Sequence, residues 1–280
     1  MKNILVPLDF SSCSIKAVEY AANLCKVLSG HMTLLHAIQV PALSDIDDET
    51  SLEIENEIMK SYEELKEKLP ILNEVDHDFK LKFSSILSEI KQIAQYNIDL
   101  IVMGTKGATG AKEVFIGSNT YEVIQDASCP VIAVPEDNSL FNLKTIALAS
   151  DYKRIDDFDD LEPLILLAKK RNAEIHVLHI GQESKISRKE LEVGKSQEQY
   201  LKSLSHSYHF IEEDDVVHGL NKYLEENRID MLAIYARKHY LAEKLFHNSV
   251  TQKMTFHTKA PLFVLPERSM KLLNADTPLN

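Results

Sequence analysis

The stretch KNILVPLDFS (residues 2–11) decides the fold, because it returns as KTIALASDYK at residues 144–153. Each copy is a short apolar run that leads into an aspartate, Asp9 in the first and Asp151 in the second. Three further pairs follow in the same order: MTLLHAI (32–38) with IHVLHIG (175–181), IDLIVMG (98–104) with IDMLAIY (229–235), and SCPVIAVPE (128–136) with KAPLFVLPE (259–267). The last two pairs share one offset of 131 residues. One structural unit is therefore written twice along the chain.

Apolar runs of strand length alternate with amphipathic segments of helical period inside each unit. Residues 12–28 predict a helix with Ser11 or Ser12 as N-cap and Gly30 just past its end; segments 52–69, stopped by Pro70, and 86–96 predict two more. Such alternation, with strands apolar on both faces, predicts an α/β fold whose parallel sheet is covered on both sides. We expect strands near residues 3–8, 31–38, 77–83, 98–104 and 130–135, and again near 144–150, 174–180, 207–212, 229–235 and 261–266.

Composition excludes several classes of protein. The formal net charge of −12 over 280 residues disfavours nucleic acid as a partner, because a phosphate backbone would be repelled over most of the surface. The longest apolar runs, such as residues 100–103, are far shorter than the ~20 residues that cross a bilayer, so no membrane partner is expected. Cys13, Cys25 and Cys129 are widely spaced and odd in number, which favours a reducing cytoplasm over a disulfide framework.

A glycine-rich segment of the first unit carries the chemistry. It reads GTKGATG from Gly104 to Gly110 after the fourth strand, and GSNT from Gly117 to Thr120 at the start of a helix. Glycines let backbone amides approach an anion, and a helix start directs free N–H groups and a positive dipole end at it. The pattern predicts a phosphate cradle. A P-loop would need GK[ST], and a dinucleotide fingerprint would be GxGxxG after the first strand, so neither fits.

These residues resemble the ATP-binding signature of the universal stress protein family, Gly-x2-Gly-x9-Gly-Ser. ILVPLDFS (4–11) and CPVIAVP (129–135) are similar to the first and last strands of that family, and the two repeats together cover almost the whole chain. The resemblance implies a tandem member with an adenine nucleotide alpha hydrolase-like fold. Each unit would hold a five-stranded parallel sheet in the order 3-2-1-4-5 with helices on both faces. ATP would lie at the carboxyl ends of the strands, where the strand order reverses.

The resemblance also implies which residues hold the nucleotide. Pro7, Leu8 and Asp9 would flank the adenosine, and Met103 and Gly104 would bracket the ribose. The glycine-rich segment and the helix start that follows it would line the phosphates. Asp9 could instead be the N-cap of the first helix, and Lys106 an ordinary surface lysine. The implied set is Pro7, Leu8, Asp9, Ala37, Met103, Gly104, Thr105, Lys106, Gly107, Gly110, Gly117, Ser118, Asn119 and Thr120. We expect no catalytic residue and no metal site of the protein's own, although Mg²⁺ could accompany ATP.

The second unit departs from the signature. At the offset of 131 residues the three glycines become Tyr235, Lys238 and Asn248, and only Ser249 and Thr251 survive opposite Ser118 and Thr120. In the first strand, Ala149 replaces Pro7. We expect this unit to have lost ATP binding and to be a structural or partner-binding module. Another anion at residues 237–239 stays open. His36 and His179 lack a second ligand at metal spacing, so they are interpreted as strand-end or core histidines.

We therefore expect a stress-response protein with an ATP-binding domain at residues 1–138, a degenerate domain at 142–270 and a tail at 271–280. ATP would be a regulatory ligand. The alternatives are a slow ATPase or phosphotransferase that uses Ser118 or Thr120, and a nucleotide-free scaffold that binds proteins. The family's strand order puts residues 130–135 and 261–265 at apolar sheet edges, so the two units should pair with each other inside one chain, and a further homodimer stays open.

Overall fold

The computed structural model describes residues 1–39, 48–94, 97–105, 118–137, 141–152, 158–182, 186–236 and 260–266. The first unit contains β1 (Asn3–Pro7), α1 (Ser12–Leu28), β2 (His31–Ala37), α2 (Asp48–Lys68), the 3-10 helix η2 (Pro70–Glu74), β3 (Asp76–Lys82), α3 (Ile86–Ala94), β4 (Leu100–Gly104), α4 (Ser118–Asp126) and β5 (Val131–Val134). The second contains β6 (Thr145–Ala149), η3 (Phe158–Leu161), α5 (Glu162–Arg171), β7 (Glu174–Ile180), α6 (Arg188–Leu201), β8 (His206–Ile211), α7 (Val216–Glu226), β9 (Met231–Ala236) and β10 (Leu262–Pro266). All ten strands lie within about two residues of the ranges predicted from the sequence.

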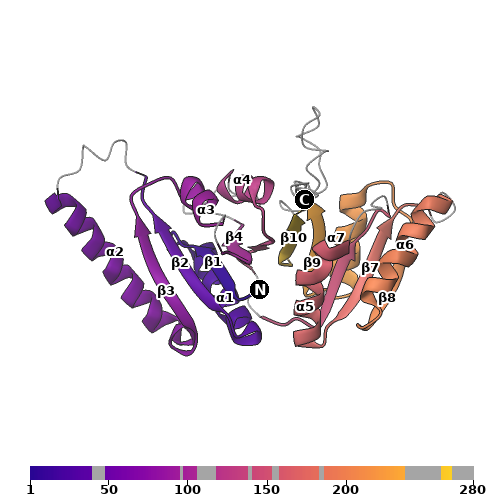
Figure 1. Cartoon of the computed structure of the whole chain (residues 1–280), viewed down its shortest axis with the longest axis horizontal. Coiled ribbons are helices and arrows are strands. Elements are labelled where there is room, and N and C mark those ends of the chain that lie inside the picture. Colours follow the sequence, from indigo (N-terminus) through magenta and orange to yellow (C-terminus); the bar gives the residue numbers. More distant parts are fainter. Residues whose placement is uncertain are drawn as a thin grey trace, which may run out of the picture.

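The strands form one ten-stranded sheet in the order β3-β2-β1-β4-β5-β10-β9-β6-β7-β8. Each unit therefore has the order 3-2-1-4-5, and every pair within a unit is parallel. The units join where β5 pairs antiparallel with β10, with Ala133 opposite Leu262 and Val131 opposite Val264. Figure 1 shows the two units side by side, with α2 at one outer end of the sheet and α6 and β8 at the other.

Helices cover both faces of this sheet. One face buries side chains of α1, α2, α5 and α6, such as Leu24 and Leu164. The other buries side chains of α3, α4 and α7, such as Ile90 and Leu220. In β4 every residue is buried, as expected for a central strand with apolar contacts on both sides. No helix among the described residues is long and apolar enough to cross a membrane.

The first helix begins and ends for identifiable local reasons. Ser11 is its N-cap, because the Ser11 hydroxyl accepts a hydrogen bond from the N–H of Ser14 at 3.2 Å. Ser29, in the left-handed conformation at φ 51°, ends it. Gly30, expected just past the end, is needed for another reason: a Cβ there would lie 2.7 Å from the carbonyl oxygen of Lys2. The glycine lets the start of β2 pass close to the start of β1.

The two units repeat each other in detail. Asp99 accepts hydrogen bonds from the backbone N–H groups of Lys2 and Asn3 at 2.7 and 3.1 Å, which ties the loop before β4 to the start of β1. Asp230 does the same with the N–H groups of residues 144 and 145, at 2.8 and 3.0 Å. The first helix is one place where the units differ, since α1 begins five residues after β1 ends at Pro7, whereas α5 is preceded by η3.

The link between the units packs on a helix from each. The ring of Phe141 lies 5.0 Å from that of Tyr20 in α1, edge to face, and the Arg171 guanidinium of α5 lies 5.4 Å from the centre of the Phe141 ring. The Tyr20 hydroxyl is buried there without a hydrogen-bond partner among the described residues. Burial raises the pKa of Tyr20 well above its usual value, so the hydroxyl stays protonated.

Candidate functional site

The described residues singled out by the sequence gather at the carboxyl ends of β1, β2 and β4 and at the start of α4. Strand order reverses between β1 and β4, and parallel sheets bind ligands at such a switch point. Pro7 closes β1 and Ala37 closes β2, while Met103 and Gly104 close β4. Four further predicted residues, Lys106, Gly107, Gly110 and Gly117, lie outside the described residues.

The first turn of α1 begins at this edge. The Asp9 carboxylate accepts hydrogen bonds from both the N–H and the hydroxyl of Ser11, at 3.0 and 2.6 Å. Asp9 is thus not the N-cap of α1, but it positions Ser11, which is the N-cap. Ser12 donates its hydroxyl proton to the carboxylate of Glu136, just beyond β5, at 2.5 Å. The positive end of the α1 dipole is therefore fixed over the ends of β1 and β5.

Cys13, in the same turn, explains why β4 ends in glycine. A Cβ on Gly104 would lie 2.9 Å from the carbonyl carbon, the carbonyl oxygen and the Sγ of Cys13. The Cys13 thiol also lies 3.7 Å from the Thr105 hydroxyl and donates to the Val134 carbonyl at 3.5 Å. Only glycine lets α1 approach β4 so closely, and Thr105 is buried by this contact.

The first turn of α4 is attached to the same point. Thr120 is buried and donates its hydroxyl proton to the Gly104 carbonyl at 2.8 Å. A hydroxyl has one proton, so the expected role of Thr120 as a phosphate donor is not supported; its bond positions the helix. Ser118 and Asn119, at the start of α4, are exposed. Both α1 and α4 therefore begin against the end of β4, with Gly104 between them.

The β1–β2 side of the edge is built from the backbone. Leu8 is buried, donates its N–H to the Leu35 carbonyl at 2.9 Å, and has its own carbonyl 2.6 Å from Nδ1 of His36. Phe10 follows in the left-handed conformation at φ 60°, with its ring 5.1 Å from the His36 ring. An aromatic residue is strained in that conformation, so tertiary contacts hold this turn. His36 is a strand-end histidine, as predicted.

This geometry can hold an anion. Two helix starts supply backbone donors and partial positive charge at one place, and a glycine backbone lies between them. Among the described residues, no group of three or more His, Cys, Asp or Glu side chains could hold a metal ion. The two carboxylates beside the site, Asp9 and Glu136, bind the serines at the start of α1.

A model of the universal stress protein family matches residues 1–135, the whole of the first unit. Universal stress protein MJ0531 from Methanocaldococcus jannaschii is 31% identical over 140 residues, which cover 48% of this chain and 81% of that protein. This chain belongs to the universal stress protein family. MJ0577 of the same organism, also a universal stress protein, is 30% identical over 157 residues, covering 49% of this chain and 97% of that protein.

The solved structure of a universal stress protein from Archaeoglobus fulgidus DSM 4304 resembles the chain over both units. It covers 94% of this chain and 98% of its own, with a TM-score of 0.73 and 20% sequence identity. At that identity the likeness shows the fold. The tandem α/β arrangement deduced from the repeat is thus confirmed as a fold of universal stress proteins.

The second unit of this universal stress protein keeps one side of the edge and changes the other. His179 Nδ1 lies 3.0 Å from the Ser150 carbonyl, and Tyr152, in the left-handed conformation at φ 53°, stacks on the His179 ring at 4.9 Å. These contacts repeat those of His36 and Phe10. At the end of β9, however, Tyr235 replaces the glycine that ends β4, and its side chain packs against the core. Lys238, Asn248, Ser249 and Thr251 lie outside the described residues.

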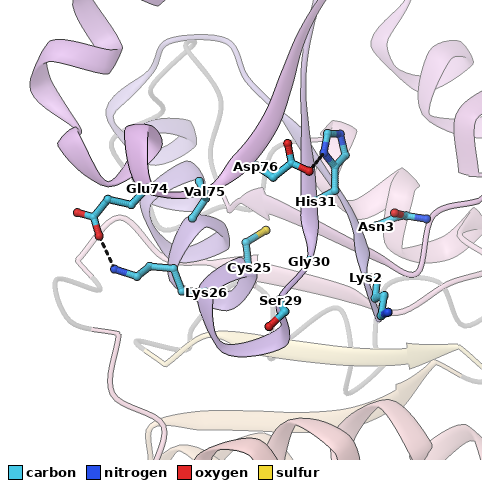
Figure 2. A pocket seen from close by; sticks show the side chains of 10 residues that line it. All are labelled: Lys2, Asn3, Cys25, Lys26, Ser29, Gly30, His31, Glu74, Val75 and Asp76. Atoms are coloured by element: carbon cyan, nitrogen blue, oxygen red, sulfur yellow. Dashed lines mark hydrogen bonds and ion pairs between the residues drawn. The ribbon is translucent and has the colours of Figure 1, made fainter.

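A pocket of about 440 Å³ lies at the opposite edge of the first unit. Figure 2 shows the side chains that line it. Lys2, Asn3, Gly30, His31 and Asp76, among its lining residues, belong to the amino ends of β1, β2 and β3. Its walls contain none of the predicted site residues. The pocket is therefore separate from the candidate site of this family member.

Sequence reasoning missed three residues that shape the site: Cys13, Phe10 and Glu136. Their contributions are contacts between distant parts of the chain, up to 124 residues apart for Ser12 and Glu136. The repeat gave one usable signal, because an aromatic residue follows the aspartate in both units. His36 and His179 were singled out by the same comparison.

Proposed function

We propose that the first unit, residues 1–138, binds ATP as a regulatory ligand in a stress response. The observation that carries this is the meeting of two helix starts on one glycine: α1 through Cys13 and α4 through Thr120 both touch Gly104. Backbone donors and dipoles aimed at one point favour a polyanion. The sequence signature from Gly104 to Ser118 resembles the family's ATP motif, and for this reason we propose a nucleotide as the polyanion.

The described residues of the set fit a nucleotide with its adenosine towards β1 and β2. Pro7 and Leu8 lie at the end of β1, Ala37 ends β2, and the exposed Ser118 and Asn119 offer polar groups at the start of α4. The phosphates would follow the segment of residues 106–117. When bound, ATP supplies a phosphate chain whose charge the two helix dipoles complement.

We propose binding without rapid turnover. In-line attack on a phosphate needs a base or a positioned water. Among the described residues at this edge, the carboxylates of Asp9 and Glu136 already accept hydrogen bonds from the hydroxyls of Ser11 and Ser12. A cradle that holds substrate and transition state equally well does not raise the turnover rate. Purified protein with Mg²⁺ and ATP should release phosphate far below the ~1 s⁻¹ at the low end of enzymes.

The second unit, residues 142–270, is proposed as the partner of the first within a pseudo-twofold dimer. The antiparallel pairing of β5 with β10 covers two apolar strands that would otherwise be sheet edges, and a short link raises their effective concentration. Tyr235 at the end of β9 puts a side chain where a backbone would have to meet phosphate. One nucleotide per chain is the result.

Calorimetric titration of the full chain with ATP tests this proposal. We expect one site, and Gly107→Tyr should abolish binding because its side chain would fill the phosphate path. Lys238→Tyr, the aligned position in the second unit, is the matched control and should leave both stoichiometry and affinity unchanged. Two equivalent sites, no heat of binding, or loss of binding in the control alone would each refute the proposal.

A further inference from the structure

Within the described part of the chain, the outer edge of β3 is not paired with another strand. β3 is the terminal strand of the ten-stranded sheet, and the pairing of its seven residues with β2 uses one edge only. No described strand pairs with the other edge. An edge strand of this length offers a row of unpaired backbone groups to another chain.

The backbone groups that face outward can be identified. Ile38 in the residue after β2 donates its N–H to the carbonyl of Lys82 at 2.8 Å, so the backbone of Lys82 faces β2. The direction of the backbone N–H and C=O groups alternates from one residue to the next along a strand, so the backbone groups of the even-numbered residues of β3 face β2. The N–H and C=O groups of His77, Phe79 and Leu81 therefore face outward and are available for pairing.

The two halves of β3 carry side chains of opposite charge, so the strand is complementary to a second copy that runs antiparallel to it. The strand reads DHDFKLK, and Asp76, Asp78, Lys80 and Lys82 are all exposed on one face. If a second copy pairs antiparallel with Phe79 opposite Phe79, Asp76 faces Lys82 and Asp78 faces Lys80, twice each. His77 and Leu81 then form hydrogen-bonded pairs, and the charged pairs fall at the non-hydrogen-bonded positions, where side chains are closest.

We propose that this edge is a self-association surface, and that two copies of the chain join through β3 about a twofold axis at Phe79. The interface is isologous: the same residues serve on both copies, as closed dimers require. The pairing continues each ten-stranded sheet into that of the second copy. It is distinct from the β5–β10 junction, which lies inside one chain.

The charges on this face are free to meet a partner. Lys80 and Lys82 make no ion pair with another described residue. The Asp76 and Asp78 carboxylates both contact His31, at 3.1 and 3.3 Å, but their side chains remain 83% and 59% exposed. Figure 2 shows the His31–Asp76 contact at the first residue of β3.

The other face of β3 carries α2, which also presents apolar surface. Tyr62 of α2 stacks on Phe79 with ring centroids 4.4 Å apart, and its hydroxyl lies 2.7 Å from Nε2 of His77. Leu52 and Met59 of the same helix are 58% and 43% exposed. A twofold axis perpendicular to the sheet would bring the α2 helices of both copies to one side of the joint sheet, where this surface could be covered.

The opposite end of the sheet lacks these features. β8 reads HSYHFI, and Gly181 donates to the Ile211 carbonyl, so His206, Tyr208 and Phe210 present the outward backbone. Antiparallel self-pairing of β8 about Tyr208 would oppose Ser207 with His209 and form no ion pair. The charge pattern therefore selects β3.

A charge-swap experiment tests the proposal. The acidic variant carries Lys80→Asp with Lys82→Asp, and the basic variant carries Asp76→Lys with Asp78→Lys. Sedimentation and light scattering of the full chain, without nucleotide, should show a wild-type dimer at high concentration. Each variant alone should dissociate roughly a hundredfold more readily, since four opposite-charge pairs become like-charge pairs, and an equimolar mixture should restore the dimer.

The control carries Lys189→Asp with Lys195→Asp, two exposed positions on α6 that change the net charge as the acidic variant does. It should dimerise like the wild type, and circular dichroism of every variant should be unchanged. A wild-type protein that stays monomeric, variants that dimerise normally, or a mixture that does not associate would overturn the proposal. None of these outcomes depends on whether ATP binds, because the titration of the first unit is a separate measurement.

Discussion

A pair of Gly→Ala substitutions with opposite expected signs tests the packing at the candidate site. In Gly104→Ala the new methyl would lie 2.9 Å from the backbone carbonyl and Sγ of Cys13, closer than carbon atoms tolerate. In Gly194→Ala, in the interior of α6, the methyl would lie 3.5 Å from the ring of Tyr152, an ordinary contact. The same chemical change therefore meets a clash in one place and open packing in the other.

The expected magnitudes follow from these contacts. Overpacking costs about 1–3 kcal/mol, and reduced freedom of the unfolded chain returns about 0.4–1 kcal/mol, so Gly104→Ala should lower the free energy of unfolding by about 1–2 kcal/mol. Gly194→Ala should raise it by about 0.5–1 kcal/mol through helix propensity. In a double-mutant cycle, Cys13→Ala should recover less than half of the loss, because two of the three close atoms are backbone.

Urea unfolding followed by circular dichroism measures both changes, and hydrogen exchange locates them, since the chain has no tryptophan to report fluorescence. Gly104→Ala should also speed exchange in the first turn of α1 and weaken ATP binding, because that turn must move away from β4. Gly194→Ala should do neither. An unchanged or increased stability for Gly104→Ala, or complete rescue by Cys13→Ala, would refute the close approach of α1 to β4.

Three further outcomes are expected. Thr120→Val should destabilise the first unit by about 1–2 kcal/mol in urea unfolding, since it leaves the buried Gly104 carbonyl without its donor, whereas Thr120→Ser keeps the hydroxyl and should lose less. Burial raises the pKa of Asp99, but the two backbone donors at the start of β1 and the N-terminal amine together hold it below its usual value. Asp99 therefore stabilises the fold above about pH 4, and the difference in unfolding free energy between wild type and Asp99→Asn should vanish as the pH falls through the folded pKa. Tyr20→Phe removes a buried hydroxyl that has no partner among the described residues, so thermal unfolding should show a neutral or slightly raised midpoint.

The strands could be predicted closely because a strand buried on both faces has an unbroken run of apolar residues in the sequence. β4 and β10 are buried at every residue and read as unbroken apolar runs between polar flanks. The limits of α1 were equally legible, since Ser11 is a strong N-cap directly before an amphipathic segment. The start of α2 was predicted four residues late, at 52 rather than 48, because its first turn is polar and has no apolar period to mark it.

The site was less predictable because its contacts join distant segments. Nothing in the local sequence indicates that the Thr120 hydroxyl points back to Gly104 rather than out to a ligand. In the sequence, Cys13 looks like one more apolar position on α1. In the structure, its close approach leaves room only for a glycine at the end of β4. Residue types therefore predicted which edge of the sheet holds the candidate site. The role of each residue at that edge could be assigned only from its position in the structure.

Comparison of the two units separates scaffold from site within one chain. Contacts that recur in both units belong to their shared scaffold. Asp99 and Asp230 each accept hydrogen bonds from backbone N–H groups at a strand start, and His36 and His179 each contact a backbone carbonyl at a strand end. The end of the fourth strand is where the units diverge, from Gly104 to Tyr235. The fold is kept in both units, so this difference agrees with the proposal that Gly104 meets a ligand as well as Cys13. The second unit, to which the proposal assigns no nucleotide, has a tyrosine there whose side chain packs against the core.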